Sequence, residues 1–350
     1  MRVKYATANG TAQAGSDYVA RKQQEEIARR QVVVGHDGPP EDSDLDGVDQ
    51  DDGENNRMYT FPIAGLTLPL WLPILAACGI TLLTSMVGIS GAFLLVPFQL
   101  SVLGFASPAA SATNLVFNLV AIPGGLYRYG REGRLFWPLA LVIAAGGAPG
   151  TLVGAWLRTH WLAEQSSFEP FAGVILGYLA WRMLADWRAR DPMPEAKGAR
   201  IKRLSGNVRR LGFAYGDRDY SCGVPSLLSF SFLVGIIGTA YGIGGGSFMV
   251  PICLAVYRLP IHAIAGATLA ATLMTSAIAL AAYVWLPVPP GIVAGPDWLL
   301  GLAFGSGGLV GAYLGARLQR HVPQRWLKGC LGLLLLGLAL GYALPATKLP

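Results

Sequence analysis

Charged residues are scarce in this chain and absent from long parts of it. Asp, Glu, Lys and Arg make up 14% of the 350 residues, whereas soluble domains contain about 25%. No charged residue and no histidine occurs in residues 68–127, and residues 168–181, 261–284 and 327–344 are nearly as apolar. A helix of about 20 apolar residues crosses a bilayer core of about 30 Å. The sequence therefore predicts a multi-pass protein of the cell (cytoplasmic or inner) membrane and excludes an ordinary soluble domain.

Cysteine and histidine are rare as well, with four of each in the chain. The cysteines form no Cys-x-x-Cys pair, and the histidines form no cluster with the spacing of metal ligands. We therefore expect no metal and no other cofactor. The cysteines are assigned to packing: Cys78, Cys222, Cys253 and Cys330.

The first 60 residues have a different composition, with twelve Asp and Glu against seven Lys and Arg. Low hydrophobicity and many like charges predict a disordered acidic tail. Residues 42–47 match the first half of a calcium-binding EF-hand loop, but Gly53 stands where that loop needs Glu. The predicted organisation is the tail at 1–60, a first transmembrane repeat at 66–187, a basic cytoplasmic linker at 188–222 and a second repeat at 223–345. We expect the basic linker to contact membrane lipid and not nucleic acid.

A glycine-rich pattern occurs twice within the apolar sequence. Residues 88–92 read Gly-Ile-Ser-Gly-Ala, residues 242–246 read Gly-Ile-Gly-Gly-Gly, and a Val-Pro pair follows each copy. Glycines at this density interrupt a helix. Inside a bilayer, interrupted backbone is tolerated only where it faces protein or a water-filled cavity. The pattern predicts that the first helix of each repeat is broken at its glycine-rich stretch and faces a central site.

The duplication continues beyond these stretches. Thr113 is matched by Thr268 and Trp137 by Trp298, and glycines spaced by four residues recur as Gly146, Gly150 and Gly154 and as Gly307, Gly311 and Gly315. Such stripes predict close helix packing. The expected fold is an all-α polytopic membrane protein with two homologous halves of about four to five transmembrane helices each, giving about eight to ten crossings. Basic residues alternate between matching loops, which favours halves of opposite orientation over a parallel arrangement with eight spans.

These residues resemble the sulfite exporter TauE/SafE family of membrane permeases. The resemblance covers roughly residues 66–344. It rests on residues 88–97, Ala112-Thr113-Asn114, 127–131, 150–157, 241–251 and 313–317. It implies transport of sulfite, organosulfonates or related small anions across a bacterial-type cytoplasmic membrane. The first copy departs from the family's commoner glycine cluster at Ser90 and Ala92.

A substrate anion needs groups that neutralise its charge. We expect the spans to lack a buried Lys or Arg, so helix N-termini after the two stretches must supply the positive potential. Asn, Thr and Ser side chains at mid-span are the candidate donors, with Thr275 and Ser276 on the same helical face as the threonines and Gln99 as a weaker candidate. The same side chains could instead bond helix to helix. The predicted substrate-binding residues are Gly88, Ser90, Gly91, Asn114, Asn118, Gly242, Gly244, Gly245, Gly246, Thr268 and Thr272.

Two other functions stay open at this point. Gly88-Ile89-Ser90-Gly91 also matches the motif around the nucleophile of intramembrane serine proteases, but the second copy has Gly244 in place of Ser90 and each histidine lies outside mid-span. A membrane scaffold or receptor without transport would leave the broken helices unexplained. We therefore expect no catalytic residue and no enzyme activity. The sequence does not indicate an oligomeric state.

Overall fold

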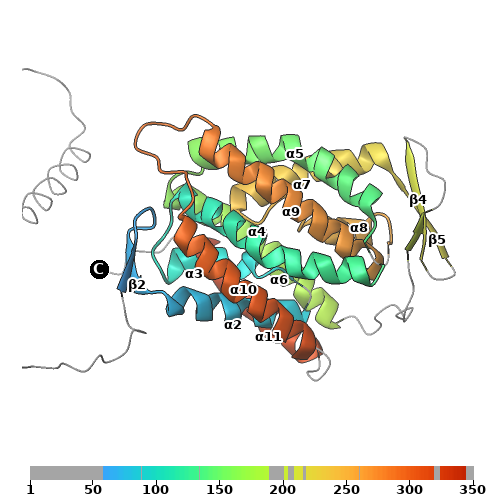
Figure 1. Ribbon diagram of the computed structural model, residues 1–350, viewed down its shortest axis with the longest axis horizontal. Helices are drawn as coiled ribbons and strands as arrows, with labels where there is room; N and C mark the ends of the chain where they lie inside the picture. The colour runs from blue at the N-terminus through green and yellow to red at the C-terminus, as the bar shows by residue number, and fades with distance from the viewer. Residues whose placement is uncertain are drawn as a thin grey trace, which may run out of the picture. The chain divides into compact units, whose positions relative to one another are not determined.

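A computed structural model describes residues 58–87, 89–133, 135–188, 201–203, 209–215, 218–259, 261–318 and 324–343 (Figure 1). The predicted acidic tail, as far as residue 57, lies outside these residues. The helices are α2 (Trp71–Val87), α3 (Ala92–Ser101), α4 (Pro108–Arg131), α5 (Trp137–His160), α6 (Gln165–Arg188), α7 (Val224–Tyr241), α8 (Met249–Ala255), α9 (Ile261–Trp285), α10 (Trp298–Leu318) and α11 (Gln324–Ala343). The strands are β1 (Met58–Phe61), β2 (Leu66–Pro69), β3 (Ile201–Arg203), β4 (Arg210–Tyr215) and β5 (Arg218–Gly223).

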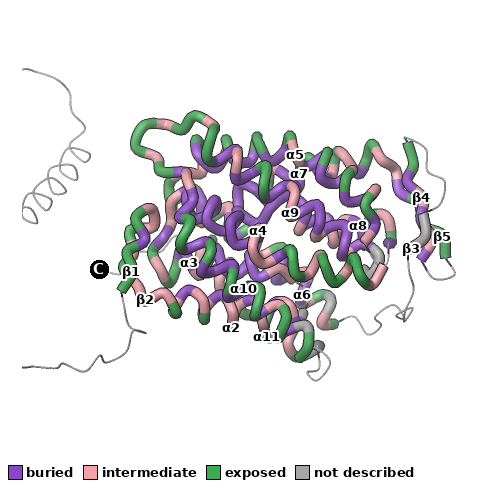
Figure 2. The backbone as a smooth tube through the Cα atoms, viewed as in Figure 1, coloured by how far each residue is buried: buried purple, intermediate pink, exposed green. Residues whose placement is uncertain are grey.

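The helices have the length and the surface of membrane spans. Six helices of the described chain are long and apolar enough to cross a bilayer, namely α4, α5, α7, α9, α10 and α11. Figure 2 shows the buried backbone gathered at the centre, while the outer helices carry exposed positions. Large apolar side chains are exposed there, including Leu75, Val174 and Leu333. In water such a surface would be unstable, so the chain is a multi-pass membrane protein.

The glycine stripes fix how the longest helices pack. A Cβ atom added at Gly146 of α5 would lie 2.7 Å from the carbonyl oxygen of Leu228 in α7. The remaining stripe glycines also meet backbone carbonyls: Gly150 and Gly154 face Phe232 and Ile236 of α7, and Gly307, Gly311 and Gly315 of α10 face Ile74, Cys78 and Leu82 of α2. The close packing predicted from the sequence is thereby confirmed.

The order of these contacts gives the helix directions. Successive glycines of α5 meet successive turns of α7, so the two helices run parallel, and α10 runs parallel to α2 in the same way. By contrast, α4 and α9 run antiparallel, because Asn118 contacts Ser276 while Gly125 faces Leu269. The strands that lead into α2 and into α7 lie at opposite ends of the helices (Figure 1). The chain therefore enters α2 and α7 from opposite ends.

Two small antiparallel sheets correct the all-α prediction. β1 pairs with β2 across a turn, and β3, β4 and β5 form a three-stranded sheet. Strand β4 alternates inward and outward residues, and its Phe213 packs against Phe136 at the start of α5. This alternation is the signal of a strand. In the sequence, the basic charge of the surrounding segment masks this alternation.

Asp297 joins the first hairpin to the helices. Its carboxylate accepts hydrogen bonds from the backbone N–H groups of Ile63 and Ala64, both at 3.2 Å, and from that of Leu300 at 3.1 Å. Its own N–H donates to the hydroxyl of Thr113 at 2.9 Å. The buried carboxylate thus caps the N-terminus of α10 and holds the hairpin turn, while the backbone N–H of Asp297 holds α4.

We expect Gly150→Ala to weaken the α5–α7 contact. The added methyl group would overlap the backbone of Phe232, and overpacking of this kind costs about 1–3 kcal/mol. Gly337→Ala in α11 is the matched control, since no atom lies within 4 Å of the Cβ position there. The melting temperature of the purified protein in detergent should fall for Gly150→Ala and hold for Gly337→Ala. Equal melting temperatures would contradict the packing.

Candidate functional site

The candidate site lies where α4 and α9 cross in the core. Asn118 of α4 donates a hydrogen bond to the hydroxyl of Ser276 in α9 at 3.2 Å. Polar side chains on both helices are almost completely buried: Ser111, Asn114 and Asn118 on α4, and Thr268, Thr272, Thr275 and Ser276 on α9. Buried polar groups inside a membrane protein are costly unless they are hydrogen-bonded, and they mark functional positions.

The second glycine stretch lies against this crossing. Helix α7 ends at Tyr241, and Gly242 and Gly244 take left-handed backbone angles with φ of 97° and 85°. The N–H groups of Gly242, Ile243 and Gly244 all donate to the carbonyl of Gly238. A Cβ atom at Gly242 would lie 2.7 Å from the Cα atom of Ser111, and one at Gly246 would lie 2.5 Å from the backbone nitrogen of Thr272. Left-handed angles and close contacts both require glycine here.

The two asparagines of α4 bind the interrupted backbone. The Asn114 amide nitrogen donates to the carbonyl of Gly242 at 2.8 Å and to that of Ala92 at 3.1 Å, so it joins both glycine stretches. The Asn118 amide nitrogen donates to the carbonyl of Ile243 at 2.7 Å. Their side-chain oxygens are buried and have no hydrogen-bond partner among the described residues. The amide nitrogens of both asparagines thus donate to the protein, while their side-chain oxygens stay available to accept hydrogen bonds from a ligand.

The threonines of α9 divide into two groups. Thr275 accepts a hydrogen bond from the N–H of Gly245 at 3.0 Å, so it contacts the second stretch directly. The hydroxyls of Thr268 and Thr272 donate to carbonyls of their own helix, those of Ile264 and Thr268. Both threonines also border Gly246. The sequence predicts Thr268 and Thr272 as substrate-binding residues, and the structure shows that the hydrogen bond to Gly245 is made by Thr275.

The first glycine stretch is built differently. Gly88 lies outside the described residues. Ser90 is half-buried, and its hydroxyl accepts from the N–H of Ala92 at 3.3 Å at the start of α3. Gly91 is buried, and its nearest neighbour is Thr81 in α2. The backbone N–H groups of Leu94 and Leu95 donate to the carbonyl of Gly91, as at the start of an ordinary helix.

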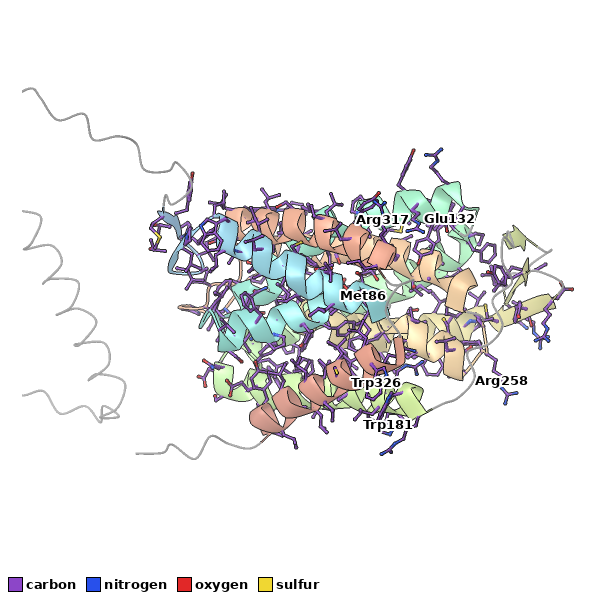
Figure 3. All side chains as sticks on the ribbon, turned by 90° about the horizontal axis from the view of Figure 1, so that it is seen from below. Met86, Glu132, Trp181, Arg258, Arg317 and Trp326 are labelled. Carbon is purple, nitrogen blue, oxygen red and sulfur yellow. The ribbon has the colours of Figure 1, made fainter. Side chains whose placement is uncertain are left out.

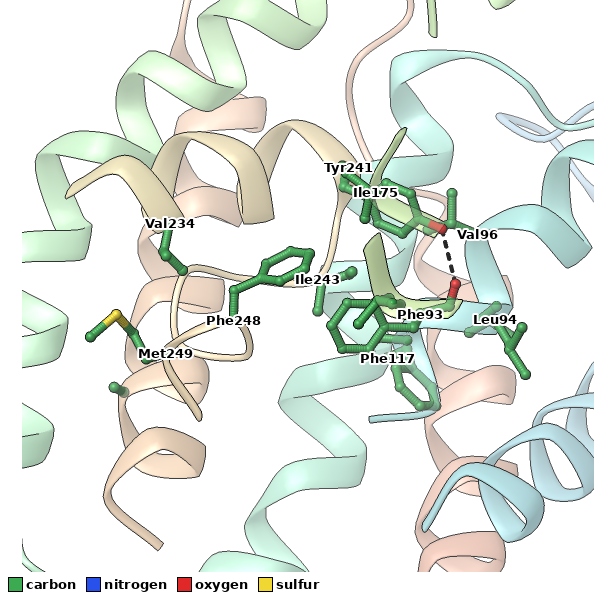
Figure 4. Close-up of a cluster of buried hydrophobic side chains, with 14 of the residues drawn as sticks. Phe93, Leu94, Val96, Phe117, Ile175, Val234, Tyr241, Ile243, Phe248 and Met249 are labelled. Carbon is green, nitrogen blue, oxygen red and sulfur yellow. Dashed lines mark hydrogen bonds between the residues drawn. The ribbon is translucent and has the colours of Figure 1, made fainter. Parts of the chain in front are cut away.

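Aromatic side chains connect α3 to α7 beside this point (Figure 4). The hydroxyl of Tyr241, the last residue of α7, donates to the carbonyl of Phe93 at 3.0 Å. The Phe93 ring meets the Phe248 ring edge-on, with centroids 5.1 Å apart. Both glycine stretches therefore belong to one packed unit, and Tyr241 is a positioning residue that the sequence analysis missed.

Arg158 corrects the expectation that no basic side chain is buried. It lies in the last turn of α5 with no exposed surface. Its guanidinium donates to the hydroxyl of Ser111 at 3.2 Å, to the carbonyl of Ala106 at 3.1 Å and to the carbonyl of Leu162. A detectable signal existed in the sequence: Gly146, Gly150, Gly154 and Arg158 are spaced by four residues, so Arg158 continues the packed stripe.

The geometry at Ser90 does not assemble a protease site in the described residues. The Ser90 hydroxyl bonds the N–H of Ala92, and His160 bonds Thr159 at the exposed end of α5. The side chain of His262 and the whole of His36 and His321 lie outside the described residues. Among the described residues, no base therefore contacts the Ser90 hydroxyl, although a serine nucleophile requires one.

Comparison with known proteins gives one family and two relatives. Residues 73–342 match the model of the family described as sulfite exporter TauE/SafE. The probable membrane transporter protein YunE of Bacillus subtilis is 24% identical over 185 residues, which are 53% of this chain and 62% of that protein. The probable membrane transporter protein y4hK of Sinorhizobium fredii is 25% identical over 239 residues, which are 67% of this chain and 82% of that protein. The match to YunE thus spans less than two thirds of its length, and no solved structure matches.

We expect Asn114→Leu to destabilise the protein. The change keeps the side-chain volume but leaves the buried carbonyls of Ala92 and Gly242 without their donor, at about 1–3 kcal/mol for each unsatisfied group. Thermal unfolding in detergent should show a lower melting temperature than the wild type. Leu115→Met, at the next and equally buried position, is the control and should change stability little. A melting temperature for Asn114→Leu equal to that of the control would show that the amide does not hold the two stretches.

Proposed function

Because the chain belongs to the sulfite exporter TauE/SafE family, we propose that it is a permease for small anions, with sulfite and organosulfonates as its substrates. The observation that carries this proposal is the meeting of two glycine stretches at the α4–α9 crossing, joined by the amide of Asn114. Interrupted helices at the centre of a membrane protein are the typical site of substrate in secondary transporters. The family name and the transporter relatives support the same class of function.

The proposed binding residues are those predicted from the sequence, with Thr275 added. Gly88, Ser90, Gly91, Gly242, Gly244, Gly245 and Gly246 supply backbone, and Asn114, Asn118, Thr268 and Thr272 supply side chains. The two free asparagine oxygens accept hydrogen bonds, so they suit a protonated oxyanion or an organosulfonate that carries a donor group. A bare, fully ionised anion needs donors or positive charge from elsewhere in the protein.

We further propose two homologous halves of opposite orientation, each with five helical segments. The offset between matched positions supports this: Gly242 follows Gly88 by 154 residues, and Leu228, which faces Gly146, follows Ile74, which faces Gly307, by the same number. The packing exchange supports it too, since α5 pairs with α7 and α10 with α2. On this proposal α2–α3 and α7–α8 are the two broken helices, and the segments make about ten crossings.

Charge at the helix ends supports one orientation. Arg128 and Arg131 end α4, and Arg317 lies in the last turn of α10, which runs parallel to α4. Glu132, Arg258 and Arg317 are seen in the same half of the molecule in Figure 3. The loop 286–297 at the other end contains no Lys or Arg. By the positive-inside rule, we propose that the ends of α4 and α10 face the cytoplasm.

Single cysteines in a cysteine-free background test this orientation. Cysteine at Arg131, Arg218 or Arg317 should resist an impermeant maleimide added to intact cells, and cysteine at the exposed Val293 should react. All four should react after the cells are opened, which controls for burial. Labelling from outside at Arg317 but not at Arg131 would favour the parallel arrangement of eight spans and contradict inverted halves.

Flux through proteoliposomes tests the function itself. Purified protein should move labelled sulfite and an organosulfonate under an imposed membrane potential, and Gly245→Leu should abolish that flux, because the Cβ position is 3.0 Å from the Cα atom of Gly235. Gly337→Leu, at an open position of α11, is the matched control and should retain flux. Absence of flux for both anions in the wild type would refute the proposed substrates, and flux in Gly245→Leu at wild-type affinity would remove the second stretch from the site.

A further inference from the structure

Arg158 is a buried charge with no carboxylate partner in the described part of the chain. The ion pair described there joins Arg128 to Glu132 at 2.9 Å, far along the chain from Arg158. The acids that follow α5 bond other groups: Glu164 accepts from Ser166, and Glu169 accepts from Gln165. Removing a guanidinium from water without a counter-charge costs several kcal/mol. Such a group in a membrane protein requires an explanation.

The groups around the guanidinium are dipoles and a ring. Besides the hydroxyl of Ser111 and the carbonyls of Ala106 and Leu162, the charge stacks on the ring of Phe168, 3.8 Å from its centroid. The C-terminus of α5 contributes about half a negative charge at this point. The N-terminus of α4, which begins at Pro108 beside Ala106, contributes about half a positive charge and opposes it. The full positive charge of Arg158 therefore remains in excess.

The segment that holds Ala106 also carries buried polar side chains without described partners. The hydroxyl of Ser107, the N-cap residue of α4, is buried and unpartnered among the described residues. Gln99 has no exposed surface, and both of its side-chain polar atoms lack a described partner. Gln99 lies on the same segment, since its carbonyl accepts from the N–H of Phe105 at 2.8 Å. Each unpartnered buried group needs an explanation, and together with the excess charge of Arg158 these groups favour a ligand that brings its own charge and hydrogen bonds.

Arg158 is also connected to the second glycine stretch. The Ser111 hydroxyl that accepts from Arg158 lies 3.3 Å from the carbonyl of Ala240 and 3.4 Å from that of Tyr241. Ser111 is the residue against which Gly242 packs. One hydroxyl group therefore separates the guanidinium from the end of α7.

We infer that the guanidinium of Arg158 is a binding site for an oxyanion, and that Ser111 couples ligand binding at this site to the second glycine stretch. The planar guanidinium bonds two oxygens of a sulfite or sulfonate group at once, which a point charge cannot do. Arg158 lies at the C-terminal end of α5, opposite the basic ends of α4 and α10. The inference rests on the proposed function for the identity of the substrate, and it deepens that function by naming the residue that selects negative charge.

Thermal unfolding of the full-length protein in detergent tests the site with sulfite, sulfate and chloride as probes, in a gluconate buffer. A ligand that binds the folded state raises the melting temperature as its concentration rises. Arg158→Met removes a buried charge but also the donor to the carbonyls of Ala106 and Leu162, so its response to each anion is measured against its own melting temperature in gluconate. Its response to sulfite should require a concentration at least about tenfold higher than in the wild type.

Two variants make the result unambiguous. Arg158→Lys keeps the charge and loses the fork, so its response should fall between those of the wild type and Arg158→Met. Arg128→Met removes an exposed arginine and should respond as the wild type does. If Arg158→Met is too unstable to purify, the shift in Arg158→Lys decides the question alone.

The outcomes separate this inference from the proposed function. A wild-type response to sulfite in Arg158→Met, whatever its melting temperature in gluconate, would show a purely structural arginine while leaving sulfite transport intact. A response to sulfate or chloride that depends on Arg158, without flux of sulfite or an organosulfonate, would refute the proposed substrates and support the site. A wild type whose melting temperature responds to none of the three anions would overturn the inference.

Discussion

The backbone between α2 and α3 and between α7 and α8 must find hydrogen-bond partners inside an apolar molecule, and the rest of the core is arranged to meet this requirement. Water cannot supply the partners, and each unsatisfied buried group costs about 1–3 kcal/mol. Asn114 meets part of this requirement in both stretches, because its amide nitrogen donates hydrogen bonds to the carbonyls of Ala92 and Gly242. Thr275 supplies the acceptor for the N–H of Gly245. Polar residues on α4 and α9 are thus a consequence of the interruptions, whatever ligand binds beside them.

Close contact between helices is what brings the two stretches together. The glycine stripe of α5 packs against the backbone of α7, and the stripe of α10 packs against the backbone of α2. Each stripe therefore contacts a helix that belongs to the other copy of the sequence pattern. Helices from the two copies of the sequence pattern are therefore packed against each other. In a lipid environment no hydrophobic force pulls helices together, and contact between backbones has to supply the cohesion. A methyl group at one stripe position would separate an entire helix from the site it positions.

Composition and periodicity predicted the features that repeat along the chain, and failed for features set by single contacts. The apolar runs indicated the membrane helices, and the spacing of four residues indicated the packed stripes. The choice of Thr275 over Thr268 as the partner of Gly245 depends on where α9 lies against the second stretch, which no periodicity states. Ser90 and Gly244 occupy matching positions in the sequence, but Gly91 packs on its own copy's helix and Gly244 packs on α9. Strand β4 was missed because its alternation is short and lies among basic residues.

Arg158 shows why a charge near a helix end is ambiguous in a sequence. A long basic side chain at such a position can extend to the membrane surface or turn into the protein, and both have the same sequence context. The stripe favours the inward direction, because Arg158 stands four residues after Gly154 and so lies near the face that packs on α7, and its guanidinium contacts Ser111 of α4 and Phe168 of α6. The matching position of the second copy, counted by the offset of the glycine stripes, is Gln319, which carries no charge. The stripe glycines therefore recur in both copies of the sequence pattern, whereas an arginine four residues after the last stripe glycine occurs in the first copy alone, so the two copies differ in charge at matched positions.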